Sequence, residues 1–284
     1  MLKIAATGTP SPARGAPILL RGEVGALFRQ AAECGCQGIE LHLRRAEDVD
    51  VQAVKRLAAE YGLEVPTLGT GMAATADALT FSDPDAEIRA RAVHRLRGHI
   101  ELAAEVGSAV TIGSISGKLG SGEDGERRAR RSSALECLAQ VCRAAEHLGV
   151  TVLLEPLNRY ECDYLNTLAE AMKAAAEVGA PNLKLLADTF HMNIEEADLA
   201  ASLRAAGSSI GHVHLADSNR QAPGHGHLNV AGVLAALAEI GYRGYLSFEV
   251  LPLPDPCRAI RDGIAAIHAA IGGAGEMDRK ELKP

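Results

Sequence analysis

The sequence is poor in aromatic residues and has no excess of positive charge. Aromatic residues make up 3% of the 284 residues, tryptophan is absent, and the net charge is −7. Proteins that bind single-stranded nucleic acid stack bases on aromatic rings, and nucleic-acid binding in general uses a basic surface against the phosphates. We therefore expect no nucleic-acid partner.

Long apolar stretches and closely paired cysteines are also missing. Charged residues interrupt the apolar runs well before the roughly 18 residues that a membrane span requires, and the N-terminus leads directly into a predicted strand. We expect a cytoplasmic protein without membrane contact. The six cysteines lack the CxxC spacing of structural zinc sites, so we expect buried free thiols in a reducing compartment.

Short apolar runs alternate about eight times with longer, Ala-rich amphipathic stretches. The predicted strands are Leu2–Ala6, Gly38–His42, Glu64–Leu68, Ala109–Ile112, Thr151–Leu154, Leu183–Ala187, Ile210–Leu215 and Tyr245–Val250. The predicted helices are Val24–Glu33, Val51–Tyr61, Asp85–Val106, Arg127–His147, Leu168–Val178, Leu199–Ala206, Val230–Ile240 and Cys257–Ile271. This order predicts an α/β fold, a (β/α)8 TIM barrel. We expect a single domain over residues 1–272 and a C-terminal tail over 273–284.

An open, doubly wound sheet is the alternative architecture for such an alternation. It is disfavoured because no GxGxxG or GxxxxGK[ST] motif follows the first predicted strand. The Gly-rich, charged segment Lys118–Arg131 predicts a mobile loop after the fourth strand. Such a loop is either simply solvated, or a lid, or a source of cations such as Lys118 for an acidic substrate.

Carboxylates follow or end three predicted strands, on the side where a TIM barrel places its active site. They are Glu155, Asp188 and Glu249. A carboxylate beside a buried strand is costly unless a cation compensates it. His212 and His214 share one face of the seventh strand, and we favour His214 because it lies nearer the carboxyl end. His212 is interpreted as a deeper, hydrogen-bonded histidine.

Longer motifs surround these residues. They are EPLNRYE (Glu155–Glu161), LADTFHMNIEE (Leu186–Glu196), GHVHLADSNRQAPGHGH (Gly211–His227) and the closing FEVLPLP. With them, the sequence resembles the D-tagatose 3-epimerase group of the xylose isomerase-like TIM barrels. The stretch GTGMAATADALTFSDPDAEIRARAV narrows the resemblance to the 5-keto-L-gluconate epimerase branch.

The resemblance implies one divalent metal ion, Mn²⁺ before Mg²⁺ or Co²⁺, and a set of site residues. The implied metal ligands are Glu155, Asp188, His214 and Glu249, and the implied substrate-binding residues are Glu161, His191 and Arg220. Hard oxygen ligands with one nitrogen suit these ions. The resemblance also implies a homo-oligomer, a dimer or a tetramer.

The implied reaction inverts C3 of a ketose or keto-sugar acid. Glu155 and Glu249 would flank C3, one removing its proton and the other returning it, through a cis-enediolate that the metal stabilises. The expected substrate is similar to 5-keto-L-gluconate and D-tagaturonate, with D-tagatose, D-fructose or a phosphorylated ketose as alternatives. Arg220 could pair with an acid group of the substrate.

Three other functions remain open from the sequence. An aldose–ketose or hydroxypyruvate-type isomerase would use the same metal site but move the proton between C1 and C2. An endonuclease IV-like DNA repair enzyme needs further His and Asp ligands on the earlier strands, where this sequence has Gly69-Thr70 and Ile112-Gly113. A non-catalytic sugar-binding barrel usually shows a substituted ligand, and none is substituted here.

Overall fold

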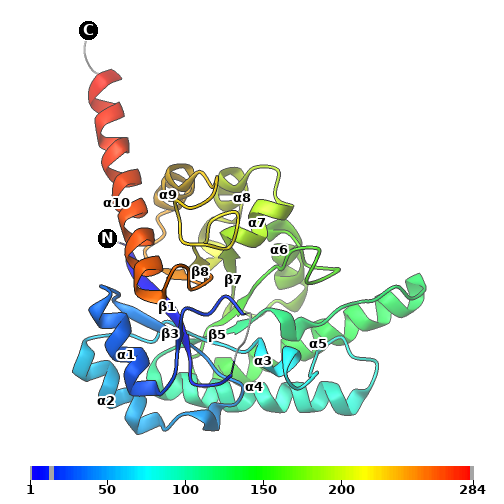
Figure 1. Cartoon of the computed structure of the whole chain (residues 1–284). Coiled ribbons are helices and arrows are strands. Elements are labelled where there is room, and N and C mark those ends of the chain that lie inside the picture. Colours follow the sequence, from blue (N-terminus) through cyan, green and yellow to red (C-terminus); the bar gives the residue numbers. More distant parts are fainter. Residues whose placement is uncertain (1, 13–15, 282–284) are drawn as a thin grey trace.

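Eight parallel strands close into a barrel in the computed structural model, which describes residues 2–12 and 16–281 (Figure 1). The barrel strands are β1 (Lys3–Thr9), β3 (Gly38–His42), β4 (Thr67–Gly69), β5 (Ala109–Ile112), β6 (Val152–Leu154), β7 (Leu183–Asp188), β8 (Ile210–His214) and β9 (Tyr245–Phe248). Neighbours pair in sequence order, and β1 pairs with β9, which closes the sheet. The short strand β2 (Leu20–Arg21) pairs with the end of β1. The predicted TIM barrel is confirmed.

Helices surround the barrel (Figure 1). They are α1 (Val24–Glu33), α2 (Val51–Tyr61), α3 (Met72–Thr75), α4 (Ala86–Val106), α5 (Asp124–His147), α6 (Leu168–Val178), α7 (Thr189–Glu195), α8 (Leu199–Ala206), α9 (Val230–Glu239) and α10 (Pro256–Glu281), with 3-10 turns η1 (Ala46–Asp48), η2 (Ser114–Ser116) and η3 (Gly207–Ser209). Side chains cap several of these helices by accepting hydrogen bonds from backbone N–H groups in the first turn. Thr167 accepts from the backbone N–H of Glu170 at the start of α6, for example. Seven of the eight predicted helices agree with these bounds to within three residues, whereas α10 ends ten residues later than predicted and the short helices α3 and α7 were not predicted.

The third strand begins later than predicted because of a proline. Glu64 makes only an isolated bridge to Gly38, and the regular strand β4 starts at Thr67, directly after Pro66. Proline has no backbone N–H to donate to the neighbouring strand, which interrupts the ladder.

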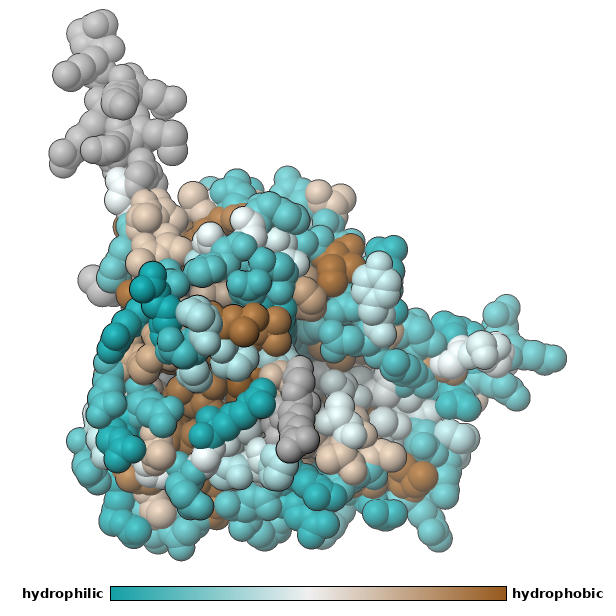
Figure 2. All heavy atoms as spheres, in the orientation of Figure 1, coloured by the Kyte–Doolittle hydropathy of each residue, from teal (hydrophilic) through white to brown (hydrophobic). Residues whose placement is uncertain are grey.

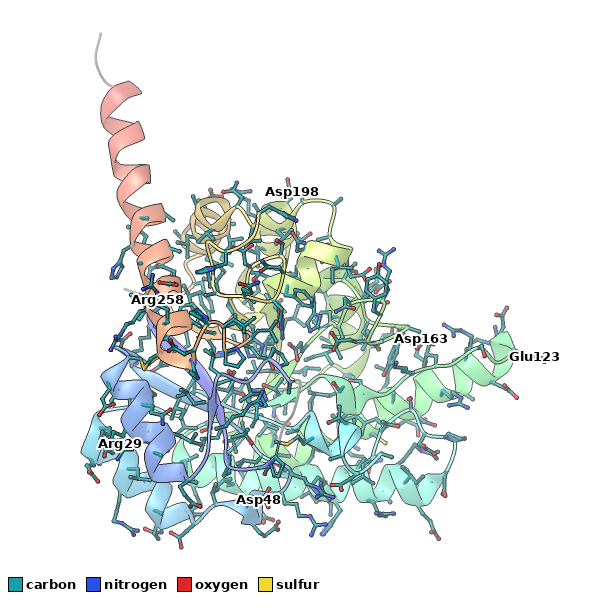
Figure 3. The ribbon with its side chains drawn as sticks, in the orientation of Figure 1. Arg29, Asp48, Glu123, Asp163, Asp198 and Arg258 are labelled. Atoms are coloured by element: carbon teal, nitrogen blue, oxygen red, sulfur yellow. A yellow bond between two sulfur atoms is a disulfide. The ribbon has the colours of Figure 1, made fainter. Side chains whose placement is uncertain are left out.

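The segment Lys118–Arg131, predicted as a mobile loop, is largely held in place. Its second half is the first part of α5, whose N-cap Glu123 lies at the tip of a helix end that projects from the barrel (Figure 3). The Asp163 carboxylate accepts hydrogen bonds from the backbone N–H groups of Leu119 and Gly120, each at 2.7 Å, and it pairs with Arg127. These three interactions fix the loop before α5.

The cysteine prediction was wrong for one pair. Cys34, at the end of α1, forms a disulfide with Cys257 in the first turn of α10, whereas Cys36, Cys137, Cys142 and Cys162 are buried free thiols as predicted. Closure of the barrel places the first and last strands side by side, so helices from opposite ends of the sequence become neighbours. A separation of 223 residues hides this pairing from the sequence.

Polar and charged side chains cover most of the face seen in Figure 2, with apolar residues in scattered patches. Among the described residues, no helix combines the length and the hydropathy that crossing a bilayer requires. Helix α10 continues past residue 272, where we expected the domain to end. The side chains of 273–281 and all of residues 282–284 lie outside the described part of the chain.

Candidate metal centre and active site

The four side chains predicted as metal ligands meet at one point. Glu155 follows β6, Asp188 ends β7, His214 ends β8 and Glu249 follows β9. Because parallel strands in a barrel end at the same rim, these positions converge, and one donor atom of each residue lies within 4.8 Å of the others. From Nδ1 of His214 the nearest carboxylate oxygens are 3.4 Å away on Glu155, 3.5 Å on Asp188 and 3.4 Å on Glu249.

Two atoms at this point are buried without a hydrogen-bond partner in the described part of the chain. They are Nδ1 of His214 and Oε1 of Glu155. Buried polar atoms are normally satisfied, so an orphaned pair needs an explanation. A divalent cation bound here would be a partner for both atoms and would offset three neighbouring carboxylates, so the residues present fit a metal ion.

Arg220 lies against the same carboxylates. It donates from Nη1 to Oδ2 of Asp188 at 2.6 Å and from Nη2 to Glu249, and its guanidinium stacks 4.8 Å from the ring centre of Phe190. The backbone at Arg220 has a positive φ of 61°, which is uncommon for a residue with a side chain. The loop after β8 is therefore held in an unusual conformation that directs this arginine into the centre.

His191 and Glu161 are joined by an asparagine that the sequence analysis did not single out. Asn158 donates to Nδ1 of His191 from its side chain at 2.7 Å and from its backbone at 3.3 Å. The same side-chain amide donates to Oε1 of Glu161 at 2.9 Å. Because Nδ1 of His191 accepts, its Nε2 carries the proton and acts as the donor of the ring.

A buried carboxylate inside the barrel holds the other side of His214. Glu40 of β3 is fully buried and receives Nε2 of His214 at 3.1 Å, Nε2 of His212 at 3.1 Å and Nε2 of His42 at 2.9 Å. His212 is thus a deeper, hydrogen-bonded histidine. Since Glu40 accepts from Nε2 of His214, Nδ1 is the ring nitrogen that faces the three carboxylates and that would bind a cation after losing its proton.

The charges around the centre shift the pKa values of its two glutamates in opposite directions. Burial raises the pKa of Glu155, and His214 offsets this only in part. Burial acts on Glu249 as well, but the charges of Arg220 and His214 outweigh it and lower the pKa of Glu249. In the metal-free protein the two carboxyl groups therefore differ in proton affinity.

The centre opens into a cavity of about 450 Å³. This volume is in the range of small-molecule sites. Its walls come from loops after several strands and contain all the predicted site residues except Asp188, which is buried and paired with Arg220. The site residues in the walls are Glu155, Glu161, His191, His214, Arg220 and Glu249. Lys118 lines a neighbouring cavity instead.

Comparison with known proteins agrees with this architecture. A profile of the family described as "Xylose isomerase-like TIM barrel" matches residues 28–269. The chain is 33% identical over 229 residues to an L-ribulose 3-epimerase of Mesorhizobium japonicum, which covers 81% of this chain and 76% of that protein. It is 32% identical over 249 residues to the 3-dehydro-D-guloside 4-epimerase of Escherichia coli, which covers 84% and 91%.

A solved structure of an L-ribulose 3-epimerase matches the whole of both chains with a TM-score of 0.83 at 28% identity. These relatives are carbohydrate epimerases, enzymes of the isomerase class. The closed parallel barrel and the profile match together show that the chain belongs to the xylose isomerase-like TIM barrel family.

Proposed function

We propose that the protein is a divalent-metal-dependent epimerase that inverts C3 of a ketose or keto-sugar acid. The observation that carries the proposal is the meeting of three carboxylates and His214 around one point, with Nδ1 of His214 and Oε1 of Glu155 unpartnered. The similarity to an L-ribulose 3-epimerase supports the same reaction.

In this proposal Glu155, Asp188, His214 and Glu249 hold the ion. Hard oxygen donors with one imidazole favour Mn²⁺, with Mg²⁺ or Co²⁺ as alternatives. When bound, the ion supplies Lewis acidity, which stabilises the negative charge that deprotonation beside a carbonyl creates. Arg220, already paired with Asp188 and Glu249, balances part of the remaining carboxylate charge.

Glu155 and Glu249 move the proton. One oxygen of each faces Nδ1 of His214, and the other lies away from it: Oε2 of Glu155 beside Gly113, and Oε1 of Glu249 3.9 Å from Nδ1 of His42. Each glutamate thus has one oxygen for the ion and one for a proton. One outer oxygen removes the proton from C3, giving an enediolate, and that of the other glutamate returns a proton to the opposite face.

His191, Glu161 and Arg220 bind the substrate in this proposal. The N–H at Nε2 of His191 and the guanidinium of Arg220 donate to oxygens, whereas the Glu161 carboxylate accepts from hydroxyls. The side chain of Asn158 bonds to both His191 and Glu161 and so fixes these two residues relative to each other. The acid group of a keto-hexonate would pair with Arg220, which is why substrates of the 5-keto-L-gluconate type are included.

A second candidate is inversion at C4 beside a ketone at C3, which the similarity to the E. coli 3-dehydro-D-guloside 4-epimerase favours. The chemistry is the same, since a proton beside a carbonyl is removed and returned. Proton transfer between C1 and C2, as in an aldose–ketose isomerase, would use the same residues. The cavity walls determine which carbon lies between Glu155 and Glu249.

The proposal is tested with metal-stripped protein and a panel of D-tagatose, D-fructose and 5-keto-L-gluconate. We expect C3-inverted product, separated by chromatography, only after Mn²⁺ is added. Glu155→Gln and Glu249→Gln should abolish turnover with an unchanged circular dichroism spectrum, and Glu146→Gln, an exposed glutamate on α5, should retain it. Near-normal turnover by either site variant would contradict the two-carboxylate reaction.

A further inference from the structure

A second cavity, of about 600 Å³, adjoins the candidate active site. Four residues line both cavities: Thr75, Ser114, Leu157 and Glu161. The second cavity is built by the segments after β4, β5 and β6, the same rim of the barrel that carries the metal centre. A molecule bound at the centre can therefore extend into the second cavity past Glu161.

Hydroxyl groups supply much of the polar lining. Thr75, Thr80, Ser82 and Ser114 all contribute to the wall. Thr75 and Ser82 donate to backbone carbonyls and keep lone pairs to accept, whereas the hydroxyls of Thr80 and Ser114 form no hydrogen bond within the described part of the chain. The wall therefore offers both donors and acceptors.

The charged residues of the wall balance. Its lining includes the cations Lys118 and Arg130 and the carboxylates Asp83 and Glu161, and within residues 2–12 and 16–272 neither cation forms an ion pair. Two cations with two carboxylates give no net charge. Such a wall is suited to a neutral ligand that carries many hydroxyl groups, because cations donate to such groups and carboxylates accept from them.

An exposed aromatic residue, Tyr160, lines this cavity. Tyr160 is 79% exposed, although its backbone lies in a fixed turn. The side chain of Asn158 accepts from the N–H of Tyr160 at 3.0 Å, and Arg159 is clamped to Glu195 through both its backbone and its guanidinium. The C–H face of a sugar ring packs well on an aromatic face, whose electron density attracts it.

From these features we propose that the second cavity binds a second, uncharged sugar ring, so that the substrate is a keto sugar that carries a glycosyl substituent. The reacting unit occupies the metal centre, Glu161 lies at the junction, and the added ring packs on Tyr160 beside Arg130. This inference rests on the proposed function, because it assigns the rest of the substrate for the same site.

The test compares D-fructose with its 4-O-, 5-O- and 6-O-glucosyl derivatives on the Mn²⁺-loaded enzyme. At least one derivative should exceed D-fructose in kcat/KM, by about fivefold, which corresponds to the contribution of a single aromatic packing contact. Tyr160→Ala should remove that advantage and leave D-fructose unchanged, and Tyr160→Phe should keep it. Arg130→Ala should lower the kcat/KM advantage of that derivative over D-fructose. Arg128 is on the same helix but lines a different depression, so Arg128→Ala should leave this advantage unchanged.

Binding gives a readout that does not depend on turnover. In saturation-transfer NMR, the glucosyl protons of the preferred derivative should receive saturation from the wild type and lose it in Tyr160→Ala. Lack of epimerisation for every ketose, with this pattern intact, counts against the proposed function alone. The inference is overturned if no derivative exceeds D-fructose, if Tyr160→Ala affects both substrates equally, or if a ketose 6-phosphate or hexonate is preferred and depends on Lys118 and Arg130.

Discussion

We predict that Glu40→Gln weakens Mn²⁺ binding by about 10- to 100-fold, the usual effect of removing a carboxylate that orients a ligating histidine. The substitution keeps the shape of a fully buried side chain but replaces an acceptor-only group with one that carries an NH₂. Three histidine Nε2 atoms lie at 2.9 to 3.1 Å from this carboxylate. A neutral amide cannot accept from all three, so the ring of His214 loses its fixed orientation.

The expected loss corresponds to about 1.4 to 2.7 kcal/mol of binding free energy. It is measured by isothermal titration of the metal-stripped protein, with Mn²⁺ electron paramagnetic resonance as a second readout. Glu64→Gln is the matched control, since Glu64 lies near the opposite end of the barrel and bonds to Lys3 and Tyr245. Glu40→Asp, which retains the charge, should bind Mn²⁺ more tightly than Glu40→Gln. Wild-type affinity in a folded Glu40→Gln protein would refute the role of Glu40.

Three further predictions concern activity and stability. Gly113→Ala should lower kcat/KM by about 100-fold, because the added Cβ would lie 2.5 Å from Oε2 of Glu155 and displace it, whereas Gly25→Ala meets only ordinary contacts and should have no effect on steady-state kinetics. Cys257→Ser should lower the free energy of unfolding in urea by about 2 to 4 kcal/mol, and the stability of this variant should not change when dithiothreitol is added. A urea unfolding midpoint equal to that of the wild type would contradict a formed disulfide. Burial lowers the pKa of His99, so its contribution to stability is complete above the ordinary histidine pKa of about 6.5 and decreases as the pH falls below it. The stability difference between wild type and His99→Gln should therefore shrink from pH 8 to pH 5.5, and a constant difference would argue against this shift.

Much of the candidate centre could be predicted because each of its four ligand residues ends a strand or directly follows one. A barrel brings all strand ends to one rim, so Glu155, Asp188, His214 and Glu249 converge once the eight strands are recognised. Arg220 is different, since its position depends on a loop with a positive φ that no periodicity predicts. Only the resemblance to a family identified it.

Other features depend on contacts between distant parts of the chain. Glu40 lies between Ile39 and Leu41 inside a buried strand, and a charge at such a position is a signal that the sequence analysis missed. Its partners His212 and His214 are more than 170 residues away, so their contact appears only when the barrel closes. The Cys34–Cys257 disulfide was missed for the same reason.

The oligomeric state stays a prediction, as do the native metal and the substrate. The second cavity could not be predicted either, because it depends on how three loops pack against one another. Its residues, such as Thr80 and Tyr160, lie outside the strand ends that the sequence analysis examined for chemistry.

The most direct test of the account follows where solvent hydrogen enters the substrate. The Mn²⁺-loaded protein is incubated with each ketose or keto-hexonate in D₂O, and the labelled carbon is assigned by NMR. Removal and return of a proton by Glu155 and Glu249 predicts one deuterium at C3 in the inverted product, with no exchange after the metal is stripped. Label at C1 or C2 with an aldose product, or inversion without any label, would contradict the proposed reaction.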